Sequence, residues 1–285
     1  MRAYLPDYEL TAPGTLEAAL ALLASEPGKW RPFAGGTDLM VLLEAGKLGH
    51  KQFVSLWGIE ELHGISESPD AVTVGALTTY HDVLRSRVLS HEFPMLAQAA
   101  RETGGVATQN RGTLGGNIVN ASPAADSPPA LLAYDAELEL TSSSGSRWVP
   151  YLGFHTGYKK TIMQPAEIVS RIRLPRRRSG WHTQYRKVGT RKAQAISKVC
   201  IAVGVELDAR VVRHSRIALG SVAPIPLRCI QTEALLEGQP LTPKLIAAAR
   251  ALIEAEIIPI NDIRSTEDYR RRVAGNLLED FLRSL

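Results

Sequence analysis

The stretch 110–126 reads N-R-G-T-L-G-G-N-I-V-N-A-S-P-A-A-D, and the organisation of the whole chain is best understood from it. Gly115 and Gly116 have no side chains, so the backbone there can adopt positive φ and approach a ligand closely. Successive amides in such a turn can point in one direction and hold an anion. Thr113 and Asn117 would add side-chain donors. The stretch therefore predicts a loop that binds phosphate or pyrophosphate. The alternative is a turn or bulge in which the glycines serve backbone geometry alone.

A second glycine pair lies in the stretch 31–39, which reads R-P-F-A-G-G-T-D-L. It follows a short predicted strand at 30–33 and again offers a hydroxyl and an acid after the glycines. Two such turns can clamp the two phosphates of one dinucleotide from both sides. Neither is a usual nucleotide loop, because the sequence contains no G-x-G-x-x-G before a helix and no G-x-x-x-x-G-K-[ST].

These paired motifs resemble the FAD-binding medium subunit of the molybdenum hydroxylases, the family of the xanthine dehydrogenases and aerobic carbon monoxide dehydrogenases. A-G-G-T-D-L at 34–39 is followed by N-R-G-T-L-G-G-N at 110–117. S-P-A-A-D at 122–126 and K-V-G-T-R-K-A-Q-A-I-S-K-V at 187–199 are similar to later segments of the same family. The resemblance covers essentially the whole chain.

The resemblance implies FAD as the cofactor. Asp126 would contact the adenosine part of FAD, and its alternative role is to cap the helix that follows. Lys187 would lie near the flavin and stabilise negative charge on the reduced ring, and its alternative is an exposed surface lysine. Thr103 and Val169 match two further flavin-contacting positions, although their residue types differ from the family's. The predicted cofactor-binding residues are Pro32, Phe33, Ala34, Gly35, Gly36, Thr37, Asp38, Leu39, Thr103, Thr113, Gly115, Gly116, Asn117, Asn120, Ser122, Asp126, Val169 and Lys187.

The loop at 189–196 departs from the family. The resemblance places it over the isoalloxazine ring, where the xanthine dehydrogenases have a partly acidic loop and this chain has Arg191 and Lys192. The carbon monoxide dehydrogenases have a tyrosine near the positions of Ala195 and Ile196. The cysteine-bearing insertion of the benzoyl-CoA-reducing relatives is absent. These differences leave the electron acceptor open.

Composition excludes several other classes of protein. The net charge of +4 is modest, and the arginines at 171–178 indicate a solvated basic face, since no aromatic platform or known nucleic-acid module accompanies them. Two cysteines without a C-x-x-C motif exclude an iron–sulfur cluster or a usual zinc site in this chain and indicate a reducing compartment. The start M-R-A-Y-L-P-D-Y lacks the apolar core of a signal peptide, and no apolar run is long enough for a membrane span. We expect a cytoplasmic protein that binds neither nucleic acid nor metal.

The pattern of elements predicts an α+β protein of two domains. An FAD-binding domain of the PCMH/vanillyl-alcohol oxidase type would cover residues 1–176, with subdomains of about 1–56 and 57–176. A C-terminal domain would cover 177–285, after a linker at 175–180 (P-R-R-R-S-G). In the first domain we expect helices from Thr15 to Pro27 and at 39–45, 79–85, 93–103 and 130–134, and strands at 30–33, 52–56, around 72–74, and at 136–141 and 167–174.

Some local patterns give sharper expectations. Ser127 should cap the helix at 130–134, with prolines behind it. The strand at 136–141 alternates glutamate with leucine, which is typical of a half-buried strand. The C-terminal domain should contain three antiparallel strands at 181–188, 198–207 and 211–222, followed by three helices. Those helices cover 232–236, a segment from Thr242 to Glu256, and a last segment that is capped by Ser265 or Thr266 and buries Tyr269, Val273, Leu277 and Phe281.

The resemblance predicts an electron-transfer subunit that is active only in a complex. A partner with two [2Fe–2S] clusters would deliver single electrons from a large molybdenum-cofactor subunit, and FAD would pass pairs to NAD, oxygen or a quinone. A flavin suits this step because it takes electrons singly and gives them as a pair. One alternative is a stand-alone flavoenzyme of the same fold, although no acid–base pair can be assigned from spacing. The other is a nucleotide-binding scaffold without redox activity.

Overall fold

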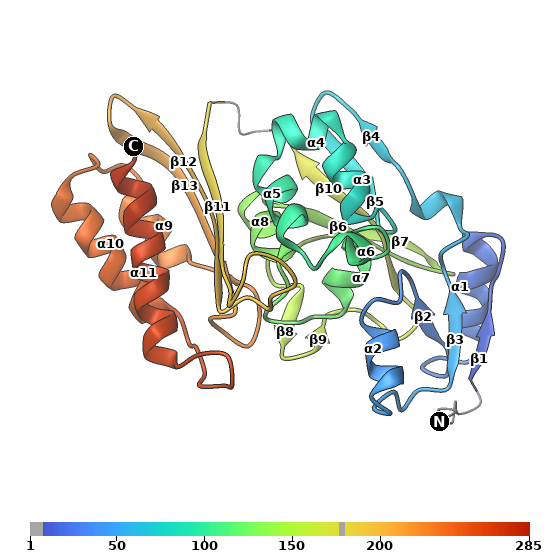
Figure 1. The fold of residues 1–285 in the computed structure, drawn as a ribbon. Coiled ribbons are helices and arrows are strands. Elements are labelled where there is room, and N and C mark those ends of the chain that lie inside the picture. The colour runs from blue at the N-terminus through green and yellow to red at the C-terminus, as the bar shows by residue number, and fades with distance from the viewer. Residues whose placement is uncertain (1–7, 177–179) are drawn as a thin grey trace.

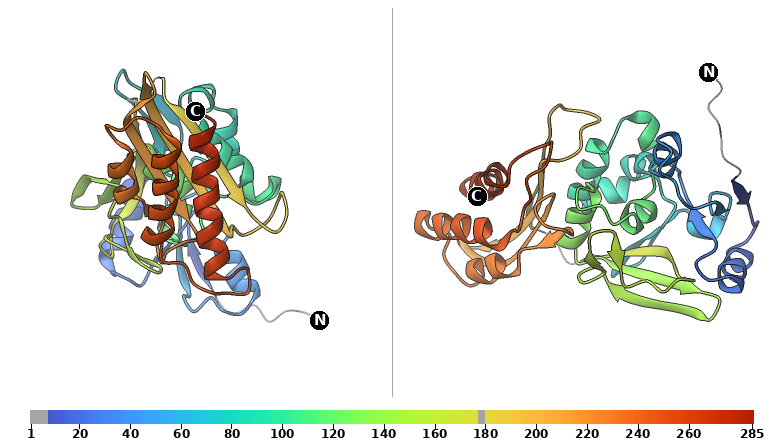
Figure 2. Two further views of the ribbon diagram at one scale, coloured as in Figure 1. Left: turned by 90° about the vertical axis from the view of Figure 1, so that its left-hand side faces the viewer. Right: turned by 90° about the horizontal axis from the view of Figure 1, so that it is seen from below.

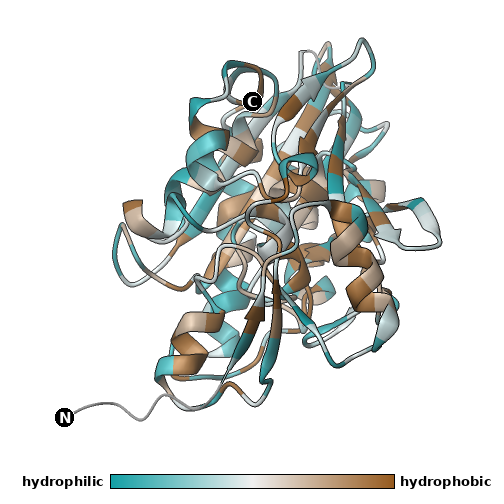
Figure 3. Cartoon of the chain, turned by 90° about the vertical axis from the view of Figure 1, so that its right-hand side faces the viewer, coloured by the Kyte–Doolittle hydropathy of each residue, from teal (hydrophilic) through white to brown (hydrophobic). Residues whose placement is uncertain are grey.

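The computed structural model describes residues 8–176 and 180–285. Sheets of three, five and four strands form its framework, and helices pack around them (Figure 1). Hydrophobic residues run through the central strands, while hydrophilic residues dominate many of the outer turns (Figure 3). The extended lead at 4–6 and positions 177–179 of the predicted linker lie outside the described residues.

The N-terminal unit is a small parallel sheet with two helices. Its elements are β1 (Glu9–Thr11), α1 (Leu16–Ser25), β2 (Arg31–Phe33), α2 (Leu39–Glu44) and β3 (Gln52–Ser55). The strands pair in the order β1-β3-β2. Thr15 caps α1, since its hydroxyl accepts a hydrogen bond from the Ala18 amide at 3.2 Å. The predicted order of helix, strand, turn, helix and strand is confirmed.

The second unit is built on an antiparallel sheet in the order β4-β5-β10-β6-β7. Its elements are η1 (Glu60–Leu62), β4 (Ile65–Glu67), β5 (Ala71–Gly75), α3 (Tyr80–Arg85), α4 (Arg87–Glu92), α5 (Pro94–Glu102), α6 (Val106–Gln109), α7 (Leu114–Val119), α8 (Ser127–Ala133), β6 (Glu137–Ser142), β7 (Gly145–Pro150), β8 (His155–Gly157), β9 (Lys160–Thr161) and β10 (Ile168–Pro175). The predicted helices and strands of this region are present, and several short elements were not predicted.

Two local expectations in this unit were wrong. The middle of strand β6 is buried on both faces rather than on one. Glu139 there is only 9% exposed, and its Oε2 accepts a hydrogen bond from Ser170 on the neighbouring β10 at 2.7 Å. The N-cap of α8 is Asp126 rather than Ser127, and the Asp126 side chain makes no capping hydrogen bond.

The stretch that was predicted as a phosphate-binding loop instead contains a helix. Gly115 and Gly116 lie in α7, and neither has positive φ. Gly115 is needed for close packing, because a Cβ atom there would lie 2.6 Å from Ala76 Cβ. The Gly115 amide donates to the Ala76 carbonyl at 2.8 Å. The glycines therefore let α7 lie directly against the chain that follows β5.

The C-terminal unit is an antiparallel sheet with helices on one face (Figure 2). Its elements are β11 (His182–Val188), β12 (Val199–Asp208), β13 (Val211–Gly220), β14 (Leu227–Arg228), α9 (Ile230–Leu236), α10 (Pro243–Glu256) and α11 (Glu267–Arg283). The two-residue β14 makes the sheet four-stranded rather than three-stranded. The other face of the sheet packs on α5 and α8, where Tyr185 and Cys200 join the hydrophobic core of the second unit.

The last helix buries most of the predicted stripe, with Val273 partly buried against the core, but not Tyr269. Thr266 is its N-cap, but Tyr269 is 41% exposed. A step of four residues turns an α-helix by about 40° beyond a full turn, so a stripe at that spacing drifts off the buried face. The structure buries Leu277 and Phe281 as predicted, together with Ala274 and Leu278.

Candidate functional site

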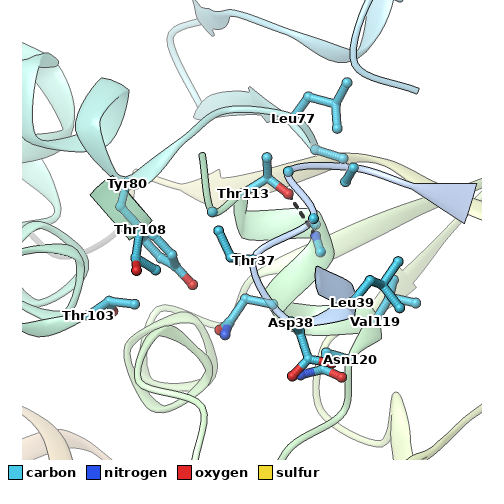
Figure 4. A pocket seen from close by; sticks show the side chains of 18 of the residues that line it. Thr37, Asp38, Leu39, Leu77, Tyr80, Thr103, Thr108, Thr113, Val119 and Asn120 are labelled. Carbon is cyan, nitrogen blue, oxygen red and sulfur yellow. Dashed lines mark hydrogen bonds between the residues drawn. The ribbon is translucent and has the colours of Figure 1, made fainter. Parts of the chain in front are cut away.

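A cavity of about 640 Å³ lies where the three units meet (Figure 4). Its walls come from the β2–α2 loop, α7, the segment 103–108, the start of β10 and the loop before β12. The predicted site residues that line it are Pro32, Ala34, Gly35, Gly36, Thr37, Asp38, Leu39, Thr103, Thr113, Gly115, Gly116, Asn117, Asn120, Asp126 and Val169. Phe33, Ser122 and Lys187 do not line it. The sequence motifs thus converge on one cavity, and the contacts that these residues make with FAD stay a prediction.

The two glycine segments touch each other beside this cavity. A Cβ atom on Gly35 would lie 1.6 Å from the Arg111 carbonyl oxygen, which is a backbone atom that cannot rotate away. Gly36 has a φ of +77°, a conformation that favours glycine. The Arg111 guanidinium stacks over the Trp57 ring at 3.7 Å and helps to hold its own segment in place. The first glycine pair is therefore required both for close approach and for its backbone conformation.

The backbone amides of the two segments have different partners. At the start of α7, the amides of Leu114, Gly115 and Gly116 donate to the Thr78 carbonyl, the Ala76 carbonyl and the Thr113 hydroxyl, respectively. In the first segment, the amides of Gly35, Gly36 and Thr37 donate no hydrogen bond to any described residue. Free amides in an αL-containing loop can hold an anion. The first loop therefore keeps donors free for an anion, whereas the expectation that the Gly115–Gly116 amides form an anion nest was wrong.

Several predicted polar side chains already have partners within the chain. Asn117 Oδ1 accepts from the Ser127 hydroxyl at 2.6 Å, and Asn120 Oδ1 accepts from Lys159 Nζ at 2.5 Å. The Ser122 hydroxyl accepts from the Ala124 amide at 3.3 Å. These contacts fix the C-terminal end of α7 and the turn after it. The amide nitrogens of the asparagine side chains remain available as donors.

A buried ion pair borders the cavity at Asp126. Lys187 Nζ lies 2.7 Å from Asp126 Oδ2 and 2.9 Å from the Glu102 carbonyl oxygen, and its side chain is 5% exposed. The alternative for Lys187 is therefore wrong, because its side chain is not at the surface. Asp126 does occupy the N-cap position of α8, but its side chain makes no capping hydrogen bond. Asp126 Oδ1 is buried and has no hydrogen-bond partner among the described residues.

The protonation of Asp126 reflects this burial. Removal from water raises the pKa of the carboxyl to about 6, and the Lys187 charge opposes the rise without cancelling it. An unpaired carboxylate oxygen at the edge of a cavity is a strong acceptor for a ligand N–H or O–H group. The arrangement fits a ligand that brings a donor to this point.

Tyr80 is a cavity residue that the sequence reasoning missed. It is the first residue of α3, and its ring is 2% exposed. Its hydroxyl has no hydrogen-bond partner among the described residues. A capping box formed by Thr79 and Asp82 sets the start of α3, and this T-x-x-D pattern is the signal that could have placed Tyr80 in the first turn.

The loop between β11 and β12 closes the cavity from the C-terminal side. Gln194, Ala195 and Ile196 line it. The Gln194 amide donates to the Gly104 carbonyl at 3.2 Å, and the Gln194 side chain lies where a Cβ atom on Gly105 would be. The loop therefore lies at the cavity, and its position over the isoalloxazine ring stays a prediction.

Comparisons with known proteins bear on both parts of the chain. A family model described as "FAD binding domain in molybdopterin dehydrogenase" matches residues 6–177. A model described as "CO dehydrogenase flavoprotein C-terminal domain" matches residues 184–285. The chain belongs to the FAD-binding medium-subunit family of the molybdenum hydroxylases. Its cofactor is FAD, and it is an oxidoreductase subunit.

Individual relatives support this membership over nearly the full length. The glyceraldehyde dehydrogenase medium chain of Sulfolobus acidocaldarius is 32% identical, covering 95% of this chain and 95% of its own. The carbon monoxide dehydrogenase medium chain of Hydrogenophaga pseudoflava is 31% identical, covering 96% of this chain and 95% of its own. A solved structure of carbon monoxide dehydrogenase from Hydrogenophaga pseudoflava, lacking the Mo-pyranopterin moiety, matches with a TM-score of 0.93 at 31% identity over 96% of both chains.

Two further observations concern the described part of the chain, residues 8–176 and 180–285. None of its helices is both long and apolar enough to cross a membrane. No group of three or more His, Cys, Asp and Glu side chains there is arranged to hold a metal ion.

Proposed function

We propose that this chain is the FAD-binding electron-transfer subunit of a molybdenum-containing hydroxylase or dehydrogenase complex. In this proposal a [2Fe–2S] partner delivers electrons to FAD, and FAD passes them to NAD, a quinone or oxygen. The observation that carries it is the cavity, which is lined by a loop with free amides and by Asp126 of a buried ion pair. These features suit a dinucleotide, which has a charged pyrophosphate in its middle and a polar ring at its end.

The residues around the cavity suggest how FAD is held. The free amides of Gly35, Gly36 and Thr37 would bind the pyrophosphate. Asp126 and Lys187 belong to one ion pair, so they cannot serve opposite ends of an extended FAD. We therefore assign both to the flavin end, in place of the adenosine contact first expected for Asp126. When bound there, FAD supplies the redox chemistry, and the Lys187 cation would stabilise negative charge on the reduced ring.

Partners are proposed on the printed names of the relatives, which include medium chains and FAD-binding subunits of several dehydrogenases. We propose a [2Fe–2S] small subunit and a molybdenum-cofactor large subunit. The loop with Arg191 and Lys192 and the segment 151–160, where Leu152 and Tyr158 are exposed, are candidate docking surfaces. The organic substrate would bind the large subunit, so this chain does not identify it.

The test compares the isolated chain with the assembled complex. The isolated chain should take up FAD non-covalently, because neither glycine segment contains a histidine or cysteine for a covalent link. Substrate should reduce that flavin only after both partner subunits are added, as followed by loss of flavin absorbance. The proposal fails if the chain does not take up FAD. It also fails if the chain with FAD alone oxidises an aldehyde or purine at ordinary enzymatic rates, on the order of 1 per second or faster.

A further inference from the structure

Tyr80 is held rigidly against the second glycine segment. Its amide donates to the Gly112 carbonyl at 3.2 Å, and Thr79 forms an isolated β-bridge with Thr113. A Cβ atom on Gly112 would lie 3.0 Å from the Tyr80 ring, so this glycine leaves room for the tyrosine. The segment that carries Tyr80 therefore cannot shift independently of α7. The ring lines the cavity, and its hydroxyl points into it (Figure 4).

The Tyr80 hydroxyl and Asp126 Oδ1 form a complementary pair. Both atoms are buried, belong to residues that line the cavity and make no hydrogen bond of normal geometry within the described chain, although the Ser127 hydroxyl lies near enough to Tyr80 to lower its pKa. Burial raises the pKa of Tyr80, and the Asp126 charge adds to the rise. A phenol donates readily and a carboxylate only accepts. A buried polar group without a partner is unfavourable, so a bound ligand that pairs both atoms recovers that energy.

We propose that Tyr80 is a cofactor-positioning residue that donates a hydrogen bond to a carbonyl oxygen of the flavin ring, while Asp126 Oδ1 accepts from the adjacent ring N–H. This inference rests on the proposed FAD-binding function. The pyrimidine edge of isoalloxazine alternates carbonyl and N–H groups, which matches this donor–acceptor pair. An adenine edge offers a similar alternation, but it gains no negative charge that would use the buried Lys187 cation.

The experiment uses fragments of the cofactor to separate its two ends. The full-length chain, freed of FAD, is titrated with FAD, with FMN as the ring-bearing probe and with ADP as the ring-free probe. Tyr80→Phe removes only the hydroxyl, and Tyr269→Phe makes the same change on the exposed face of α11. We expect Tyr80→Phe to weaken FAD and FMN about tenfold, as for one lost hydrogen bond, and to leave ADP unchanged. Tyr269→Phe should change none of the three.

A second measurement guards against a folding effect. The ratio of FMN to ADP affinity within one variant does not depend on the folded fraction, and thermal melting reports stability directly. The reduction potential of bound flavin should also fall in Tyr80→Phe, because the lost donor stabilised the electron-rich ring. Unchanged FAD and FMN affinity in Tyr80→Phe overturns the inference, and so does a loss of ADP affinity with FMN unaffected. A wild-type chain that binds neither FAD nor FMN would instead overturn the proposed function itself.

Discussion

The two glycine segments look alike in sequence and play different parts in the structure. The segment 34–39 keeps the amides of Gly35, Gly36 and Thr37 free of intrachain partners and uses a left-handed glycine at 36. The segment 112–117 is helical from Leu114, and its amides bond to the chain around Ala76 and Thr78. One segment offers its backbone to a ligand, whereas the other builds the wall against which that ligand lies.

A glycine pair therefore indicates that another group approaches the backbone closely, but it does not identify that group. At Gly115 the neighbour is Ala76, and at Gly35 it is the Arg111 carbonyl. The second stretch still contributes to the site, but through the side chain of Asp126 at its end. The segment 34–39 thus contributes its backbone to the site, and the second stretch contributes a side chain.

The largest effect is expected where the two segments meet. Gly35→Val places Cβ on the Arg111 carbonyl, so the first loop must move away from the second. Because its amides have no other partners, that loop can move without unfolding the protein, and we expect at least a thousandfold loss of FAD affinity, about 4 kcal/mol. Titration of the chain with FAD measures it.

Gly14→Val is the matched control for this change, since a Cβ atom at Gly14 meets nothing within 4 Å. It should bind FAD like the wild type. If Gly35→Val also binds FAD normally, the clamp between the two segments is not part of the site.

The next effect concerns the acid that the second stretch brings to the cavity. In the chain without FAD, the pKa of Asp126 is about 6, above its usual value near 3.8. The folded chain therefore binds more protons than the unfolded chain between these values. The stability that this group contributes is fully present below pH 3.8 and is lost as pH rises through 6.

Urea unfolding between pH 4 and pH 6 tests the direction of this pH dependence. The reference is Asp126→Asn/Lys187→Met, which removes both charges and leaves no unpaired lysine. The unfolding free energy of wild type relative to the double variant should fall by about 2 kcal/mol across that range. The pKa of His155 is lowered to about 4 by burial, which gives an opposite slope, but it cancels because both proteins contain His155. A constant or rising difference would contradict the burial of an ionisable Asp126 beside the cavity.

The sequence predicted the convergence of the site because its motifs carry local chemistry. Glycine pairs, the Thr15 cap and the strand patterns depend on neighbours within a few residues. The partners of the Leu114 and Gly115 amides lie far away in the chain, so no local pattern showed that these amides were already used. The burial of Glu139 likewise depends on Ser170 in another strand.

Side-chain partners were the least predictable part of the site. Asp126 and Lys187 were each selected by the family resemblance, but spacing did not show that they form one ion pair. The T-x-x-D pattern at 79–82 could place Tyr80 at the start of a helix but not in the cavity. Tyr80 enters the cavity because the chain at 76–80 is hydrogen-bonded to the second glycine segment. Such relations arise from the tertiary fold.

The smallest expected effect distinguishes the roles of the two segments most directly. Thr37 and Thr113 both line the cavity and both were predicted to bind FAD. The Thr113 hydroxyl accepts from the Gly116 amide at 3.1 Å and caps α7, whereas the Thr37 hydroxyl makes no hydrogen bond within the described chain. Valine keeps the shape of either side chain and removes its oxygen.

Thr37→Val should therefore weaken FAD binding about fivefold and leave the melting temperature of the FAD-free chain unchanged, since only a ligand contact is lost. Thr113→Val should lower the unfolding free energy by about 1 kcal/mol even without FAD, as expected for a lost helix cap. FAD titration and urea unfolding of the two variants side by side measure both effects. If the two variants exchanged these behaviours, the first segment would be the structural one and the second would hold the phosphates, which is the reverse of what the free amides at 35–37 indicate.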